Sequence, residues 1–209
     1  MLEKSCKDFI KELSSKEPVP GGGGACAYLG ALGTALGAMV GNLTLGKKKY
    51  KEFEKDIEKL LILSEGIIYD FERLVSKDAE VFFPLSEAYR LPKNTDEERK
   101  VKEEALQKAL VDATIVPLEI ARLCLKAVDL HEEFAKKGTK MAISDVGVGV
   151  IFCKAAFQGA KLNVLINTKL MKNEKLKDLV EKELSIIEKE ILEKADRLYI
   201  DIEKELSGR

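Results

Sequence analysis

The sequence predicts an all-α protein built as an antiparallel bundle of long helices. Apolar residues recur at helical spacing along almost the whole chain, whereas the strict alternation typical of β-strands is nearly missing. No internal repeat or low-complexity linker divides the 209 residues, and a chain of this length can bury a substantial core. We therefore expect residues 1–209 to form a single helical domain.

The first two helices differ in composition. Apolar spacing predicts a short helix that ends at Leu13, and the following stretch, residues 18–46, contains no charge. That stretch opens with two prolines and Gly21–Gly24, so its helix is expected to begin near Gly23 or Gly24. Its length would suffice for a membrane span, but small residues recur throughout, including Gly30, Gly33, Gly37 and Gly41. This pattern favours a closely packed buried helix, or one at a subunit contact, over a membrane span.

Helical periodicity continues from residue 48 to the end of the chain. A long third helix is expected over 48–91, with a kink at residues 80–84 because Pro84 lies inside it. Thr95 and Glu98 form a capping box that starts the next helix, which Pro117 kinks or restarts and Gly138 ends. Two more helices should follow, one capped by Ser144 and rich in small residues, and a last one with a narrow apolar seam from residue 176 to 206.

Composition excludes several classes of function. The net charge of −1 argues against nucleic-acid binding. The four cysteines are far apart and the chain has one histidine, so we expect free, buried thiols in a reducing cytoplasm and no metal site. No secretory signal pattern is visible at the N-terminus. The single histidine, His131, stands beside two glutamates on a charged helix, and we expect it at the surface.

The glycine run is the first candidate binding site. Gly21, Gly22, Gly23 and Gly24 lack a Cβ, so a ligand can approach their backbone. The helix that follows directs free N–H groups and its positive dipole end into this loop, which suits an anion or a carbonyl oxygen. A flexible turn between two helices explains the same residues equally well.

Two acids are the candidate catalytic groups. Asp78 falls in the apolar stripe of the third helix, where a carboxylate is costly unless it is paired or functional. Asp145 follows Ser144 at a helix start and lies near Lys140, an arrangement that suits proton transfer. The alternative for Asp78 is a carboxylate at the edge of the stripe that is solvated or bonded to backbone. The alternative for Asp145 is an ordinary first-turn acid that complements the helix dipole.

Two further groups of polar residues are candidate binding residues. Asn163 and Asn167 are four residues apart on one helix face, where they can hydrogen-bond a ring or neighbouring helices. Lys47, Lys48 and Lys49 follow the glycine-rich helix and suit a polyanion, although such charge runs are usually solvated.

Seven short motifs occur in a fixed order between Phe9 and Leu170, and together they resemble the cyclodeaminase domain of the formiminotransferase-cyclodeaminase family and its stand-alone bacterial relatives. The motifs are Pro20-Gly-Gly-Gly-Gly-Ala25, Leu43-Thr-Leu-Gly-Lys-Lys-Lys-Tyr50, Lys77-Asp-Ala79, Leu91-Pro-Lys93, Val116-Pro-Leu118, Ser144-Asp-Val146 and Asn163-Val-Leu-Ile-Asn167. No formiminotransferase domain accompanies them in this sequence. Some stand-alone relatives are methenyltetrahydrofolate cyclohydrolases.

The resemblance implies an enzyme of folate one-carbon metabolism. The first expected reaction converts 5-formiminotetrahydrofolate to 5,10-methenyltetrahydrofolate and ammonia, as in histidine degradation. The alternative is hydrolysis of methenyltetrahydrofolate to 10-formyltetrahydrofolate. Neither reaction needs a metal or a redox cofactor.

The same resemblance suggests roles for the candidate residues. One of Asp78 and Asp145 would protonate the leaving amine while the other orients the substrate or a water. Lys47, Lys48 and Lys49 would hold a polyglutamyl tail. We also expect a homodimer, because the small-residue faces and the last seam offer more packing surface than one bundle needs. The non-enzymatic alternative is a helical oligomerisation scaffold.

Overall fold

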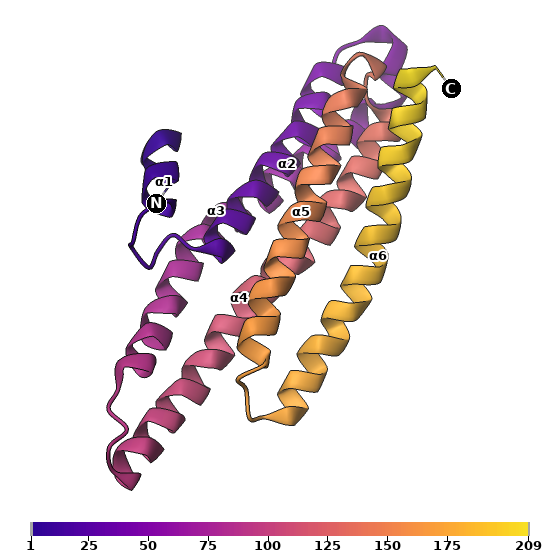
Figure 1. Cartoon of the computed structure of the whole chain (residues 1–209). Coiled ribbons are helices and arrows are strands. Elements are labelled where there is room, and N and C mark those ends of the chain that lie inside the picture. Colours follow the sequence, from indigo (N-terminus) through magenta and orange to yellow (C-terminus); the bar gives the residue numbers. More distant parts are fainter. Residues whose placement is uncertain (1, 209) are drawn as a thin grey trace.

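The computed structural model describes residues 2–208, and within them every regular element is helical. The predicted all-α bundle is therefore confirmed, and Figure 1 shows its long helices lying side by side. The elements are α1 (Cys6–Leu13), α2 (Gly22–Thr44), the short 3₁₀ helix η1 (Lys48–Phe53), α3 (Glu54–Arg90), α4 (Asp96–Lys137), the 3₁₀ turn η2 (Lys140–Ala142), α5 (Ile143–Thr168) and α6 (Glu174–Ser207).

Helix boundaries follow local signals, with three differences from the sequence expectations. The capping box at Thr95 is present, with the Thr95 side chain accepting from the Glu98 backbone. Helix α2 begins one or two residues earlier than expected, at Gly22, and the third helix begins as 3₁₀ before it becomes α-helical at Glu54. The expected cap at Ser144 is wrong: α5 already starts at Ile143, and no side chain caps it.

Both internal prolines lie inside continuous helices. Pro84 belongs to α3 and Pro117 to α4, so neither proline ends its helix. Each nevertheless lacks the N–H that would bond to the carbonyl four residues earlier. The α3–α4 hairpin extends beyond the other helices at one end of the bundle, where it carries a small apolar cluster of its own around Leu110 (Figure 1).

The glycines of α2 are used inside the subunit. A Cβ built at Gly33 would lie 2.8 Å from the carbonyl oxygen of Gly149, and one built at Gly149 would lie 2.8 Å from the Gly33 oxygen. The backbones of α2 and α5 therefore touch. A Cβ at Gly30 would lie 2.5 Å from the Phe71 ring. These contacts confirm a closely packed helix, but they place the glycine face within one chain and not at a subunit contact.

The last helix also packs within its own subunit. Its seam is buried against α4 and α5 at Val180, Leu184, Ile187, Ile191, Ala195, Leu198 and Ile202. Ion pairs flank the seam, among them Arg122–Glu183 to α4 and Lys161–Glu188 to α5. Exposed pairs of this kind contribute little each. The apolar seam is thus the main attachment of α6 to the bundle.

Two helical stretches, Gly22–Thr44 and Lys140–Thr168, are long and apolar enough to cross a membrane by length and composition. Half of each apolar window is buried inside the bundle, and core helices of folded bundles commonly satisfy the same criterion.

The cysteines are free thiols, as expected, but they are not all buried. Cys124 and Cys153 are buried, Cys26 is half-buried and Cys6 is exposed. Burial raises the pKa of Cys26 to about 11 and that of Cys153 to about 12. These two thiols therefore stay protonated at neutral pH.

The expectation of a surface histidine is wrong. His131 is fully buried, with Nδ1 2.7 Å from the Ala127 carbonyl oxygen, and its ring fills the space that Gly37 and Gly149 leave open. Among buried side-chain nitrogen and oxygen atoms of residues 2–208, only its Nε2 has no hydrogen-bond partner. The neighbouring glutamates misled the prediction, because His131 continues the buried stripe of Cys124, Ala127 and Val128 on the opposite side of α4.

Acid is expected to destabilise the protein through this histidine. Burial lowers the pKa of His131, so below about pH 6.5 the unfolded chain binds a proton that the folded chain resists. The free energy of unfolding should then fall by up to about 1.4 kcal/mol per pH unit until the folded-state pKa is reached. Urea unfolding between pH 7.5 and 5.5 measures this slope. His131→Gln should flatten it, since the chain has no other histidine; an unchanged slope in that variant would contradict the assignment.

Candidate active site

The first candidate site is a pocket of about 150 Å³ where the start of α2 meets α3, α4 and α5. Its polar side chains are Asp78 from α3 and Asn163 and Asn167 from α5, and its backbone contribution is Gly21–Gly23. Pockets for whole drug-sized ligands usually start near 300 Å³, so this one holds part of a ligand, such as one ring system. Phe82 and Pro117 contribute apolar walls.

Asp78 is fixed against the first turn of α2. Its Oδ2 accepts a hydrogen bond from the Gly24 backbone N–H at 2.8 Å. A side chain at Gly23 would overlap with the carboxylate, so glycine is required there by close approach. Burial raises the pKa of Asp78, and the Gly24 N–H opposes that rise only in part. A carboxyl group held in this way gains and loses a proton more readily near neutral pH than a solvated one.

The remaining sequence-predicted residues lie at the other end of the bundle. Helix α2 carries Gly22 at one end and Thr44 at the other, about 33 Å apart at 1.5 Å per residue. Lys47, Lys48 and Lys49 follow the far end, and the Thr44 hydroxyl accepts from the Thr139 backbone there. Within one subunit, therefore, the lysines lie far from the glycine loop.

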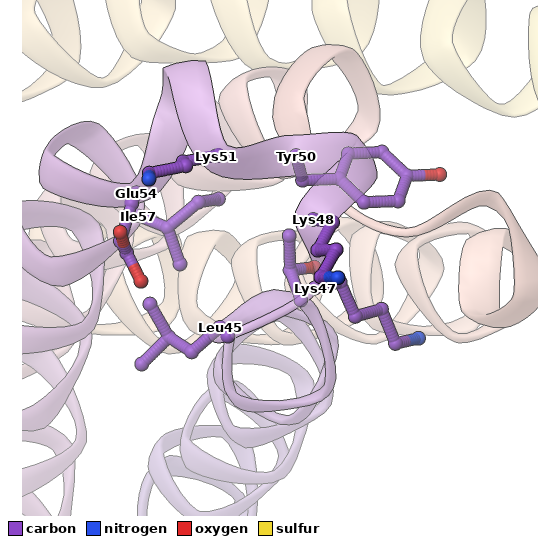
Figure 2. Close-up of a pocket in the computed structure, with 9 residues that line it drawn as sticks. Leu45, Lys47, Lys48, Tyr50, Lys51, Glu54 and Ile57 are labelled. Carbon is purple, nitrogen blue, oxygen red and sulfur yellow. The ribbon is translucent and has the colours of Figure 1, made fainter.

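Figure 2 shows the pocket at this second end, with a volume of about 210 Å³. Gly46 makes the turn after α2 with a positive φ of 73°, a conformation that glycine adopts without strain. Two of the candidate lysines, Lys47 and Lys48, line the pocket together with Lys51, which was not among the candidates. Lys49 does not line it; its ammonium lies 5.5 Å from the centre of the Tyr50 ring.

Tyr50 is a site residue that the sequence interpretation overlooked, although it ends the motif that contains the lysines. Its hydroxyl oxygen accepts from the Lys140 backbone N–H at 3.1 Å, and this bond lowers the pKa of the phenol. The Lys47 ammonium donates to the Thr139 hydroxyl at 3.1 Å. Three lysines, a phenol of lowered pKa and the carboxylate of Glu54 thus line this pocket, and we call this lysine-rich region the cationic end of the bundle.

Asp145 and Ser144 belong to this cationic end and not to the Asp78 pocket. Asp145 is half-buried and Ser144 exposed in the first turn of α5. Lys140, the expected partner of Asp145, binds other groups: its ammonium donates to Glu205 at 3.0 Å and to the Ala135 carbonyl at 3.2 Å. Asp78 and Asp145 therefore lie far apart in one subunit, Asp78 against the first turn of α2 and Asp145 in the first turn of α5.

A metal is not indicated by the donors present. Among residues 2–208, no cluster of three or more His, Cys, Asp or Glu side chains is arranged to hold a metal ion. The polar side chains of the Asp78 pocket are one carboxylate and two amides, a set suited to hydrogen bonding and proton transfer.

These features define a helical-bundle protein with a half-buried acid in a ring-sized pocket. A family model described as formiminotransferase-cyclodeaminase matches residues 5–186. The chain belongs to this family.

Individual relatives agree with the family assignment. The chain is 45% identical over 166 residues to a methenyltetrahydrofolate cyclohydrolase of Methylorubrum extorquens, covering 79% of this chain and 80% of that protein. It is 34% identical over 178 residues to the mouse formimidoyltransferase-cyclodeaminase, covering 85% of this chain but only 33% of that protein. The crystal structure of formiminotetrahydrofolate cyclodeaminase from Thermotoga maritima superposes with a TM-score of 0.88 at 30% identity, covering 99% of this chain and 100% of that one.

Proposed function

We propose that the chain hydrolyses 5,10-methenyltetrahydrofolate to 10-formyltetrahydrofolate. Its family membership makes it an enzyme of the folate cyclodeaminase and cyclohydrolase kind. The observation that carries the choice of reaction is the 45% identity to a cyclohydrolase over about four-fifths of both chains. The sequence alone had favoured the deaminase, and the solved cyclodeaminase keeps that reaction as the second candidate.

Asp78 supplies the proton transfers in this proposal. Water adds to the methenyl carbon, and the carboxylate of Asp78 takes a proton from that water as the C–O bond forms. The tetrahedral carbon then loses its bond to N5, the second water proton leaves as the C=O bond forms, and N5 receives one proton from the Asp78 carboxyl. One proton is released overall. The raised pKa of Asp78 suits both directions of transfer.

The same geometry suits the deaminase. There the formimino group reacts in its protonated form, –CH=NH₂⁺. N10 adds to its carbon, the proton of N10 passes through Asp78 to the amino group, and ammonia leaves to give the methenyl cation. In both reactions the tetrahedral carbon lies between two folate nitrogens. Proton transfer by one well-placed carboxyl group therefore serves either substrate.

A direct assay separates the candidates. Purified protein is mixed with 5,10-methenyltetrahydrofolate or with 5-formiminotetrahydrofolate, and the methenyl absorbance is followed. Accelerated loss from the first substrate supports the hydrolase, and appearance from the second supports the deaminase. No change with either substrate would refute both and favour a helical scaffold.

We also propose a homodimer that completes the site. The outward faces of the neighbouring helices α2 and α5 expose apolar side chains along their length; these are Leu32, Met39, Leu43, Val148, Ile151, Leu162 and Ile166. A second copy packed antiparallel on this face would cover them. It would place its own cationic end, with Lys47, Lys48 and Asp145, beside the Asp78 pocket of the first copy. There Asp145 would orient the substrate or the attacking water while Asp78 transfers the proton. The lysines of the second copy would then hold the glutamyl tail of a folate bound in the Asp78 pocket of the first copy.

Mixing two inactive variants tests the shared site. If the site combines Asp78 of one subunit with Asp145 of the other, a dimer of Asp78→Asn with Asp145→Asn contains one intact site. Random exchange makes half of the dimers mixed, so about a quarter of wild-type activity should return. Sites confined to one subunit would give no recovery. Light scattering on the unmixed proteins checks the dimer, and a stable, active monomer would refute this part of the proposal.

A further inference from the structure

Pro117 leaves one carbonyl of α4 without its helical partner, and the Asp78 pocket makes use of it. In a regular helix the N–H of residue 117 would donate to the carbonyl of Ala113, but proline has no N–H. The Asn167 side chain takes that place: its Nδ2 donates to the Ala113 oxygen at 2.8 Å, from α5 to α4. The carbonyl can only accept, so the nitrogen side of the Asn167 amide must face it.

The second amide of the pocket is oriented in the same way. The Nδ2 of Asn163 donates to the Gly159 carbonyl at 2.9 Å. Each amide therefore uses one N–H for a backbone carbonyl, which leaves its oxygen and its second N–H for other partners in the pocket that the residue lines. Asp78 adds carboxylate oxygens, one of which accepts from Gly24. Each of the three polar side chains that line this pocket thus has an oxygen atom that can accept a hydrogen bond from a ligand.

We propose that Asn163 and Asn167 recognise N–H donors on the bound ring, with Pro117 as the residue that positions Asn167. This inference rests on the proposed function, and in a reduced pterin the matching edge carries the 2-amino group and N3–H. The arrangement selects against rings that lack these donors, because an amide oxygen left without a partner in a closed pocket costs binding energy.

The first experiment tests the positioning without any ligand. Nuclear magnetic resonance of the intact protein follows hydrogen exchange of the Asn167 side-chain NH₂ group. In the wild type, the bond to Ala113 should slow this exchange. Pro117→Ala restores an N–H for the Ala113 carbonyl and should release the Asn167 amide, so that exchange quickens. Pro84→Ala is the matched control, because Pro84 lies inside α3 and lines a different pocket.

The second experiment tests the recognition of donors. Binding of tetrahydrofolate is compared with binding of its 2-desamino-2-methyl analogue, which lacks the 2-amino donor. The wild type should prefer tetrahydrofolate by at least about tenfold, and Asn167→Ala and Pro117→Ala should each reduce this ratio, whereas Pro84→Ala should keep it. Asn167→Ala could fail to fold because it leaves the Ala113 carbonyl without a hydrogen-bond donor. In that case the double variant Pro117→Ala/Asn167→Ala is used. It removes the Asn167 amide oxygen, while the new N–H of residue 117 donates to the Ala113 carbonyl.

The outcomes distinguish this inference from the function on which it rests. If the protein converts a folate but binds tetrahydrofolate and its 2-desamino-2-methyl analogue equally well, the inference is overturned and the proposed function stands. An unchanged ratio in the Asn167 variants does the same. Failure to bind or convert any folate overturns both. Equal exchange rates in the Pro117 and Pro84 variants remove Pro117 as the positioning residue.

Discussion

Replacing Asp78 by Asn is expected to lower turnover by at least about a hundredfold, the usual scale for loss of a proton-transfer group. The fold should survive, because the amide oxygen of Asn can still accept the hydrogen bond from Gly24 that the carboxylate accepts at 2.8 Å. Turnover is measured from the methenyl absorbance, and folding from circular dichroism. Asp70→Asn is the matched control, since Asp70 lies on the same helix and is half-exposed beside Arg73.

The same substitution should raise the free energy of unfolding at pH 7. Burial raises the folded-state pKa of Asp78 above its unfolded value, so the folded chain holds this proton more tightly. The stability that this provides is present below the unfolded pKa and is lost as the pH rises through the folded pKa. The neutral Asn avoids that loss. A variant with near-normal turnover would remove Asp78 from the mechanism, and an inactive, unfolded variant would make its role structural.

The second large effect is expected where two helices touch through their backbones. Gly149→Ala places a methyl group 2.8 Å from the Gly33 carbonyl and into the His131 ring, where no flexible side chain can move aside. Such overpacking typically costs 1–3 kcal/mol, and a backbone clash should reach about the upper end. Urea unfolding measures the loss.

Gly66→Ala is the control for this prediction. Gly66 lies inside α3, and a Cβ built there meets nothing within 4 Å. Alanine should therefore raise stability by about 1 kcal/mol through helix propensity alone. Equal destabilisation by the two substitutions would mean that the contact between α2 and α5 is looser than described.

The all-α fold could be predicted because each helix carries its own periodic apolar pattern and end signals. The capping box at Thr95 and the seam of α6 needed only residues near in sequence. The partners of that seam and of the α2 glycines are long-range, and nothing in the local pattern says whether they belong to the same chain or to another. The α2 glycine face and the α6 seam, which the sequence assigned in part to a subunit contact, are therefore largely buried within one subunit.

The site was only half predictable for the same reason. The grouping of Asp78, Asn163, Asn167 and the glycines follows from how α2, α3 and α5 cross. The motifs that contain Lys47 and Asp145 occur in the same linear order, but order does not say at which end of a bundle each motif falls. His131 was misjudged because its sequence neighbours are charged, whereas its helix-face neighbours are apolar.

The uneven exposure of the thiols gives the protein a built-in position for a reporter dye. Maleimides react with accessible thiolates, and of the four cysteines only Cys6 is exposed. Cys6 lies in α1 with its sulfur 3.4 Å from the Tyr28 hydroxyl, so a dye there would sit close to α2. The unmodified sequence should therefore accept one fluorophore, whose emission would report on the segment leading into Gly21–Gly24 as a ligand binds.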